Sequence, residues 1–295
     1  MENSKKYSYI LSLADISVKL YSQIELVKDE IYNDFLSEEE TETLYKIEVF
    51  NSEIDLTKAK KVFSAPFVYE KEGENIYTKN ELWSVFVDSE SRFIKTQLGE
   101  NKCFVLEIPN NSKKWNLFCN ISENKINPFQ YPIGPLILYY LCLYNNMILL
   151  HASAVEYKGK TYIFSGLSGR GKTTITKLFY NKGAKVINDD RIILKVVHNQ
   201  TYVYNNPVYK CDFPKKSKVD CVFMIRHCDK NILQKIEGID AITSILSSTI
   251  QHNYNEEIIN KNISLISQLT KQISVFQLGF LPDESVVNYI IENAR

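Results

Sequence analysis

A glycine-rich loop motif in the second half of the chain constrains the fold more than any other feature of the sequence. Residues 166–173 read GLSGRGKT and match the pattern GxxxxGK[ST] of phosphate-binding loops. Glycine at 166, 169 and 171 lets the backbone adopt dihedral angles closed to other residues, so that successive N–H groups converge on phosphate oxygens. The pattern requires a strand before the loop and a helix after it, with the positive end of the helix facing the same anion.

The other residues of the motif have expected roles in binding a nucleotide. Lys172 would place a positive charge between the β- and γ-phosphates, and the Thr173 hydroxyl would ligate Mg²⁺. Arg170 has two open interpretations, as a contact to the transferring phosphoryl group and as a solvent-facing loop residue. ATP and Mg²⁺ are therefore the expected cofactors. The expected nucleotide-binding residues are Gly166, Ser168, Gly169, Arg170, Gly171, Lys172, Thr173 and Thr174.

The sequence around the motif supplies the strand and the helix that such a loop requires. We expect strands over 147–156, 160–164 and 184–188, and a helix over 172–181. The tight turn at Lys158-Gly159 makes the first two strands antiparallel neighbours, and Gly183 would end the helix. Strands and helices alternate from there to the C-terminus, which is typical of an α/β domain. The later expected elements are strands over 192–197, 201–204, 218–225 and 273–278, and helices over 238–250, 256–270 and 283–293.

Two aspartates follow the strand that comes after the loop helix. Because Asp189 lies only one helix and one turn after Lys172, we expect adjacent strands to bring the carboxylates of Asp189 and Asp190 to the sheet edge that carries the loop. Two carboxylates there can divide two tasks, holding Mg²⁺ and accepting the proton of an attacking hydroxyl. Both are candidate catalytic residues, Asp190 is also a candidate Mg²⁺ ligand, and the pattern leaves open which one is the base. The alternative is a surface turn.

One histidine and two arginines are further candidates for the site. His151 lies on the expected strand that pairs with the strand feeding the loop, so it would reach the site, and its alternative is a core histidine. Arg191 follows the aspartates, and Arg226 ends an expected strand. Both arginines are candidates to contact the substrate or to neutralise the charge of a transferring phosphoryl group.

The first 130 residues have a different character. Short runs of β-branched and aromatic residues, beginning with 7–20, are separated by clusters such as Pro109-Asn110-Asn111-Ser112, which is typical of strands and turns. An acidic helix is expected over 27–42. No catalytic spacing occurs in this half. We therefore expect a strand-rich α+β domain over 1–130, available for substrate recognition, and an α/β domain over 131–295.

The balance of positive and negative side chains limits the classes of partner that the chain can bind through its net charge. The chain has 295 residues with 35 Lys and Arg and 35 Asp and Glu, which argues against binding nucleic acid through bulk charge. Residues 1–130 hold 16 positive against 22 negative side chains, and residues 131–295 hold 19 against 13, so the loop lies in the positive half. No signal peptide and no uninterrupted apolar run of spanning length is evident. We expect a cytoplasmic protein without a nucleic-acid or membrane partner, and a homo-oligomer is compatible with the sequence.

The segment 149–194, LLHASAVEYKGKTYIFSGLSGRGKTTITKLFYNKGAKVINDDRIIL, resembles the core of the HPr kinase/phosphorylase family, including the related peptide kinases of ribosomal-peptide biosynthesis. A His-led strand, a hairpin into the loop and a strand ending in paired aspartates are shared. A weaker, ordered likeness continues to Leu278, and residues 1–130 share no motif. The resemblance implies a P-loop kinase domain with the mixed sheet of phosphoenolpyruvate carboxykinases.

The resemblance also implies roles. Lys172 and Thr173 would take phosphates and Mg²⁺, one of the two aspartates would be the general base, and His151 would act on the substrate side or support the base. The family has an acidic residue where this chain has Thr174, and its long signature loop has no counterpart here. These departures point away from HPr and from phosphorylase activity, toward a Ser or Thr hydroxyl of a peptide or small protein as acceptor.

Two other functions remain open from the sequence. A small-molecule kinase of the adenylylsulfate or gluconate kinase kind would share the loop and the strand ending in Asp, although such chains begin near the loop and enter it by one parallel strand. A regulator that binds nucleotide without chemistry is the second. The retention of Asp189 and Asp190 beside an intact Lys172 favours an enzyme.

Overall fold

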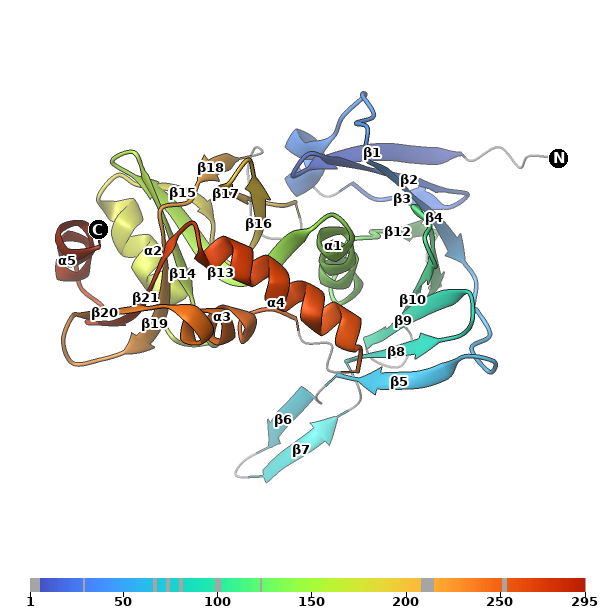
Figure 1. The fold of residues 1–295 in the computed structure, drawn as a ribbon. Coiled ribbons are helices and arrows are strands. Elements are labelled where there is room, and N and C mark those ends of the chain that lie inside the picture. The colour runs from blue at the N-terminus through green and yellow to red at the C-terminus, as the bar shows by residue number, and fades with distance from the viewer. Residues whose placement is uncertain are drawn as a thin grey trace. The chain divides into compact units, whose positions relative to one another are not determined.

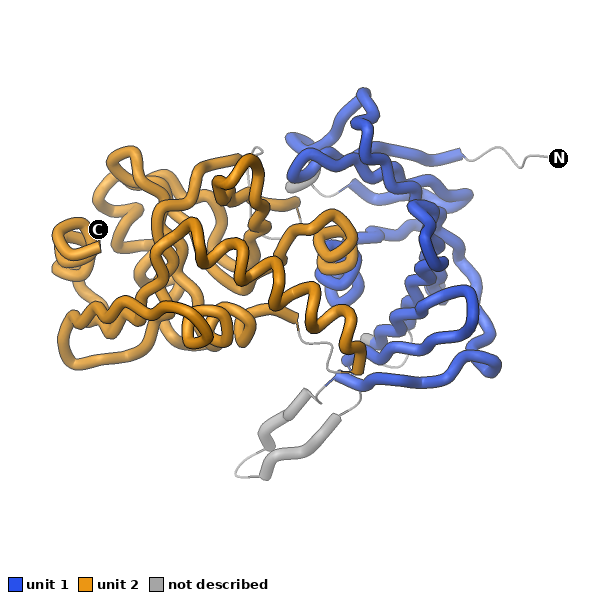
Figure 2. The backbone as a smooth tube through the Cα atoms, in the orientation of Figure 1, with its two compact units in different colours: residues 1–138 blue, residues 139–295 orange. Residues whose placement is uncertain are grey.

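The computed structural model of the chain describes residues 6–28, 30–65, 68–72, 75–79, 82–98, 102–122, 124–207, 215–250 and 254–294. The chain divides into two compact units, residues 1–138 and 139–295 (Figure 2). The division falls inside helix α1 (Ile133–Tyr144). Among the described residues, no helix combines the length and the apolar character needed to cross a membrane.

The first unit is built on an eight-stranded sheet in the order β1-β2-β4-β11-β10-β9-β8-β5 (Figure 1). Strand β4 pairs in parallel with both β2 and β11. The strands of this sheet are β1 (Tyr7–Leu13), β2 (Ile16–Ser22), β4 (Leu44–Asn51), β5 (Lys60–Ser64), β8 (Trp83–Val87), β9 (Ser91–Leu98), β10 (Lys102–Pro109) and β11 (Lys114–Asn120). The remaining elements are β3 (Glu25–Leu26) paired with β12 (Lys125–Ile126), β6 (Val68–Glu72) paired with β7 (Asn75–Lys79), and the 3₁₀ helix η1 (Glu30–Phe35).

Two expectations for this unit need correction. The run over 7–20 is not one strand but the hairpin of β1 and β2, which turns at Ala14 and Asp15 with φ of 47° and 69°. The expected acidic helix over 27–42 is wrong, because the described part of that stretch holds only the short helix η1. The backbone N–H of Ser37 donates to the carbonyl of Ile10, and the Ser37 hydroxyl accepts from the N–H of Glu39. Such local and tertiary bonds replace the helical ones.

The second unit contains a mixed nine-stranded sheet in the order β18-β17-β16-β13-β14-β19-β21-β20, with β15 also paired to β13. Strands β14, β19 and β21 run in parallel, and β13 is antiparallel to β14, β15 and β16. The strands are β13 (Met147–Tyr157), β14 (Lys160–Ser165), β15 (Lys185–Asn188), β16 (Arg191–Val197), β17 (Gln200–Tyr204), β18 (Lys216–Lys218), β19 (Cys221–His227), β20 (Ile232–Ile236) and β21 (Ser274–Phe280). The helices are α2 (Lys172–Asn181), α3 (Gly238–Leu246), α4 (Glu256–Thr270) and α5 (Ser285–Asn293).

Helices cover both faces of this sheet (Figure 1). Ile163, Val222 and Val275 lie side by side on β14, β19 and β21 and belong to the core shared with α3 and α4. The next residues along the three strands, all phenylalanine, form the opposite core with α2 and α5. Because side chains alternate across a strand, one apolar run per strand supplies both cores. The unit is a three-layer α/β structure.

The structure confirms the hairpin of β13 and β14, the helix over 172–181 and the helix over 256–270. Three details differ from expectation. The strand expected over 218–225 is two strands, β18 and β19, the helix expected over 238–250 ends at Leu246, and β20 was not anticipated. Strand β15 is not adjacent to β14, because β13 lies between them. Strand β15 pairs with Ala154, Val155 and Glu156 of β13, and this pairing decides where the aspartates that follow β15 come to lie.

Candidate active site

The glycine-rich loop joins the end of β14 to the start of α2. Gly169 and Gly171 have φ of 77° and 95°, in the left-handed region that glycine adopts without strain. A Cβ atom at Gly171 would lie 3.0 Å from Cζ of Phe280, and one at Gly166 would lie 3.0 Å from the carbonyl oxygen of Ile225. The ends of β19 and β21 thus press against the loop and leave no room for side chains at these two glycines.

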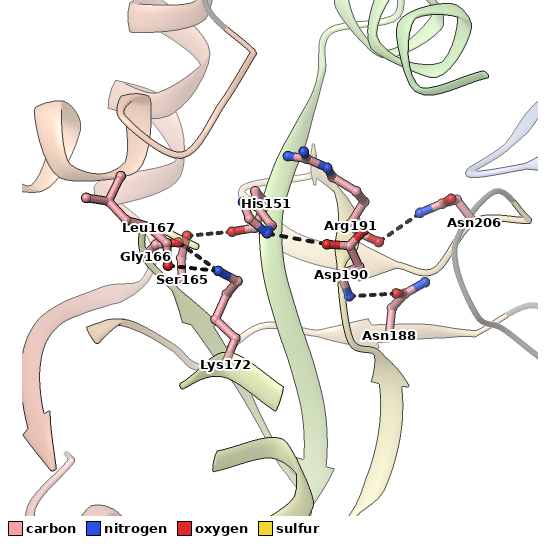
Figure 3. A network of polar contacts seen from close by, with 9 residues as sticks. All are labelled: His151, Ser165, Gly166, Leu167, Lys172, Asn188, Asp190, Arg191 and Asn206. Carbon is pink, nitrogen blue, oxygen red and sulfur yellow. Dashed lines mark hydrogen bonds and ion pairs between the residues drawn. The ribbon is translucent and has the colours of Figure 1, made fainter. Parts of the chain in front are cut away.

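Lys172 is folded inward over the loop. Lys172 is 8% exposed, and its Nζ donates to the carbonyls of Gly166 at 2.9 Å and Leu167 at 3.2 Å (Figure 3). Burial lowers the pKa of Lys172, the charges of Asp190 and Asp189 raise it, and that of Arg191 lowers it, so that the net shift is downward. Neutral carbonyls are weak partners for a buried ammonium, whereas phosphate oxygens would compensate its charge.

The strand register brings the other candidates to the same edge of the sheet. Ser165, the last residue of β14, pairs with Ala152 on β13, and on the other side of β13 His151 pairs with Arg191. The Ser165 hydroxyl donates to the carbonyl of His151 at 3.0 Å, and the N–H of Ala152 donates to the carbonyl of Asp190 at 3.0 Å. Strand β13 carries His151 and is hydrogen-bonded both to the end of the loop-bearing strand and to the Asp-Asp-Arg turn.

His151 and Asp190 point toward one another (Figure 3), and Nε2 of the histidine lies 3.3 Å from Oδ1 of the aspartate. Their side chains are 23% and 42% exposed. Burial acts to raise the pKa of Asp190, but the hydrogen bond from His151 and the positive charges of Arg191, His151 and Lys172 outweigh it and hold that pKa below the usual range. Asp190 is thus an accessible, ionised and oriented carboxylate.

Two buried asparagines support the turn that carries the aspartates, and no motif in the sequence assigned them this role. The side-chain oxygen of Asn188 accepts from the N–H of Asp190 at 3.2 Å. The side-chain amide of Asn206, which is fully buried, donates to the carbonyl of Arg191 at 2.8 Å. His227, which is exposed at the end of β19, is a further residue that no motif identified, and its Nε2 lies 2.9 Å from the carbonyl oxygen of Gly169.

The remaining candidates lie at the surface of the same edge. Ser168, Gly169 and Arg170 of the loop are exposed, and so are Thr173 and Thr174 on the first turn of α2. Arg226 is exposed at the end of β19, two residues beyond Met224, which pairs with Ser165. The exposure of Arg170 fits the solvent-facing interpretation.

The oxygen donors at this edge suit Mg²⁺ bound together with phosphates. They are less suited to a metal ion whose ligands all come from protein side chains. Within the described ranges, no three His, Cys, Asp or Glu side chains gather into a cluster that could hold a metal ion. The available ligands are the Thr173 hydroxyl and the carboxylates of Asp189 and Asp190. Mg²⁺ is usually bound by one or two protein oxygens together with substrate phosphates, so this donor set is sufficient for it.

No protein-family model matches the chain, and no curated protein matches it. Among solved structures, the chain is similar to the Hpr(Ser) kinase/phosphatase from Coxiella burnetii, with a TM-score of 0.30 and 12% sequence identity. The match covers 50% of this chain and 95% of that chain. We therefore derive the function from the side chains of the second unit themselves.

Proposed function

We propose that this protein is a Mg²⁺-dependent kinase that transfers the γ-phosphoryl group of ATP to a hydroxyl group, on a Ser or Thr of a peptide or small protein. The observation that carries the proposal is the pairing of Asp190 with His151 at the sheet edge where Lys172 and the glycine-rich loop also lie. A nucleotide-binding loop without chemistry would not need a carboxylate oriented in this way.

The chain's own residues divide the work of phosphoryl transfer. The loop amides and Lys172 would bind the phosphates, which places the γ-phosphoryl group at the edge of the sheet. Asp190, ionised at neutral pH, would accept the proton of the acceptor hydroxyl while His151 holds its carboxylate in place. A bond then forms between the acceptor oxygen and phosphorus, and the bond from phosphorus to the ADP oxygen breaks.

Mg²⁺ would be held by the Thr173 hydroxyl and by the paired aspartates, and when bound it neutralises charge on the phosphate oxygens. Thr173 suits this role because it is exposed on the first turn of α2, beside the residues that would bind the phosphates. The inward position of Lys172 leaves this surface open to a metal ion. Asp189 and Asp190 then share the base and metal functions, with the base assigned to Asp190.

The first unit is proposed to recognise the acceptor peptide. It has an open hollow of about 1120 Å³, lined by strand residues such as Phe86, Lys95 and Phe118 and by the loop residues Glu53 and Asp55. The hollow is slightly larger than common ligand sites of about 300–1,000 Å³, and polar and charged side chains line it together with apolar ones. A peptide bound there would supply affinity, and the second unit would supply chemistry.

Phosphoryl transfer can be tested directly. The protein is incubated with γ-labelled ATP, Mg²⁺ and pools of peptides that contain one Ser or Thr, and label in peptide is counted for the wild type and for Asp190→Asn. We expect Mg²⁺-dependent labelling that the substitution abolishes. Nucleotide binding without labelling of any peptide or small alcohol would favour a regulator, and labelling of a small alcohol alone would favour a small-molecule kinase.

A further inference from the structure

A buried pair of hydroxyl groups joins the helix that follows the glycine-rich loop to the strand that carries His151. Helix α2 lies against β13 and β14 (Figure 1), and the Thr176 hydroxyl on α2 donates to Oγ of Ser153 on β13 at 2.7 Å. Thr176 is 4% exposed, and Ser153 is fully buried. The hydrogen bond is therefore shielded from water, which would otherwise compete for both hydroxyl groups.

The pair lies in largely apolar surroundings. Phe164 pairs with Ser153 across the hairpin of β13 and β14, and Ile175 and Phe179 are buried on α2 beside Thr176. Phe164, Ile175 and Phe179 all belong to the core beneath that helix. Two apolar side chains of the same shape in place of the hydroxyl pair would leave the stability of this core about unchanged or higher. The packing of α2 on the sheet therefore does not require the hydrogen bond.

The two hydroxyl residues lie close behind the two halves of the candidate site. Thr176 comes four residues after Lys172, so it lies on the same face of α2, about one turn further along the helix. Ser153 comes two residues after His151, so it lies on the same face of β13. The hydrogen bond therefore ties the helix that carries the phosphate-binding lysine to the strand whose histidine holds Asp190.

We infer that Ser153 and Thr176 are positioning residues for phosphoryl transfer, and that the hydrogen bond between them sets the place of α2 and of the bound phosphates relative to the His151–Asp190 pair. The inference rests on the proposed kinase function and adds two buried residues to it. Apolar contact holds α2 on the sheet but has no preferred direction, whereas a hydrogen bond restricts sliding of the helix along β13. A displacement of about 1 Å between reacting groups can cost roughly 10²-fold in rate.

The test compares the double variant Ser153→Ala/Thr176→Val, which replaces both hydroxyl groups by apolar groups of similar shape, with Thr176→Ser, which keeps the donor. The matched control is Thr161→Val/Ser217→Ala. The hydroxyl oxygens of Thr161 and Ser217 also lie 2.7 Å apart, but at the start of β14, the opposite end of that strand from the loop. For each protein we would measure transfer of label from γ-labelled ATP to peptide pools with one Ser or Thr, ATP binding by calorimetry, and unfolding in urea.

The double variant should lose about 10- to 100-fold in kcat, while its ATP affinity stays within about twofold of the wild type and its urea midpoint does not fall. Thr176→Ser should restore kcat to within about threefold of the wild type, because its hydroxyl can donate to Ser153 as before. The control should also keep kcat within about threefold, whatever its urea midpoint, because it lies away from the loop. A purely structural role of the pair predicts the opposite, a lower urea midpoint with an unchanged kcat.

A wild-type kcat in the double variant would overturn the inference and leave the kinase proposal intact. A double variant that fails to fold would also overturn it, because the pair would then serve the stability of the core. An equal loss of kcat in the control would do the same, since any buried hydroxyl pair would then have this effect. Absence of phosphoryl transfer by the wild type would instead refute the proposed function itself, and the inference with it.

Discussion

Nε2 of His151 lies 3.3 Å from Oδ1 of Asp190, and the two residues belong to neighbouring segments paired through β13 and β16. The contact joins a strand that is hydrogen-bonded to the loop-bearing strand with the turn that carries both aspartates. Strand β13, which lies between β14 and β15, therefore carries the residue that meets Asp190. The hydrogen bond from His151 also helps to hold the pKa of Asp190 below its usual range, from which the first prediction follows.

His151→Ala should raise the pKa of Asp190. The substitution removes the hydrogen bond and the positive charge from His151, while burial continues to act in the upward direction. We would measure the pKa by NMR of ¹³C-labelled aspartate carboxyls in the wild type and the variant. His198→Ala, in the exposed turn between β16 and β17, is the control and should leave the pKa of Asp190 unchanged. An equal pKa of Asp190 in all three proteins would contradict the pairing.

The lowered pKa of Asp190 also determines how this residue makes the free energy of unfolding depend on pH. Its pKa is lower in the folded state than the value of about 3.9 for an unfolded aspartate, so its ionised form stabilises the fold at pH values above that figure. The contribution is lost as the pH falls through the lowered pKa. Acid titrations of unfolding should therefore show a smaller loss of stability in His151→Ala than in the wild type.

Asp190→Asn should lower kcat by about 10²- to 10⁴-fold, the usual effect of removing a general base, with ATP affinity nearly unchanged. Asp189→Asn is the informative comparison. If Asp190 is the base, the Asp189 variant should mainly raise the Mg²⁺ concentration needed for half-maximal activity. The reverse pattern, with a metal defect in Asp190→Asn and a turnover defect in Asp189→Asn, would exchange the two assignments.

Lys172→Met should weaken ATP binding without lowering the stability of the fold. Charge-assisted hydrogen bonds to phosphate contribute roughly 1.5–3 kcal/mol, so affinity for ATP should fall by about 10- to 150-fold in calorimetry. Folding should not suffer, because burial already lowers the pKa of Lys172 and a buried charge costs stability. The melting temperature is expected to stay level or rise. Lys177→Met, exposed on the same helix, should change neither quantity. A melting temperature that falls in Lys172→Met would show that Lys172 serves the fold.

The parts of the fold that follow from local chemistry were predictable. Helix α2 has the expected bounds because glycine at 171 starts it in the left-handed region and Gly183, with φ of 90°, ends it. Helix α4 begins where the Asn255 side chain accepts from the N–H of Ile258 at 3.0 Å. These signals lie within a few residues of the element they delimit, so the sequence alone is sufficient for them.

The arrangement of distant segments was not predictable in the same way. The contact of His227 with Gly169 depends on the parallel pairing of β14 and β19, two strands far apart in the sequence. Likewise, the support that Asn206 gives to Arg191 depends on the course of the chain after β17. A single sequence carries no local signal for either pairing. The catalytic roles of the aspartates and of His151 stay predictions until the kinetic experiments are done.

Gly171→Ala should destabilise the protein more than Gly183→Ala, although both glycines lie at the ends of α2 with nearly equal φ of 95° and 90°. The backbone strain, about 1–3 kcal/mol for a residue with a Cβ, is therefore shared. Only Gly171 has a close neighbour, since its Cβ would lie 3.0 Å from Cζ of Phe280, whereas nothing lies within 4 Å at Gly183. We expect an extra loss of about 1–2 kcal/mol in denaturant unfolding for Gly171→Ala.

A double-mutant cycle isolates the contact between the loop and β21. In a Phe280→Leu background the ring atom Cζ is gone, so Gly171→Ala and Gly183→Ala should then destabilise the protein equally. Gly171→Ala alone should weaken nucleotide binding by displacing the loop amides, and affinity should recover in part in the double variant because these amides can return to their positions around the phosphates. If the extra loss persisted in the Leu background, the cause would lie in the backbone of the loop rather than in Phe280, and the strand end would have no role in shaping the phosphate site.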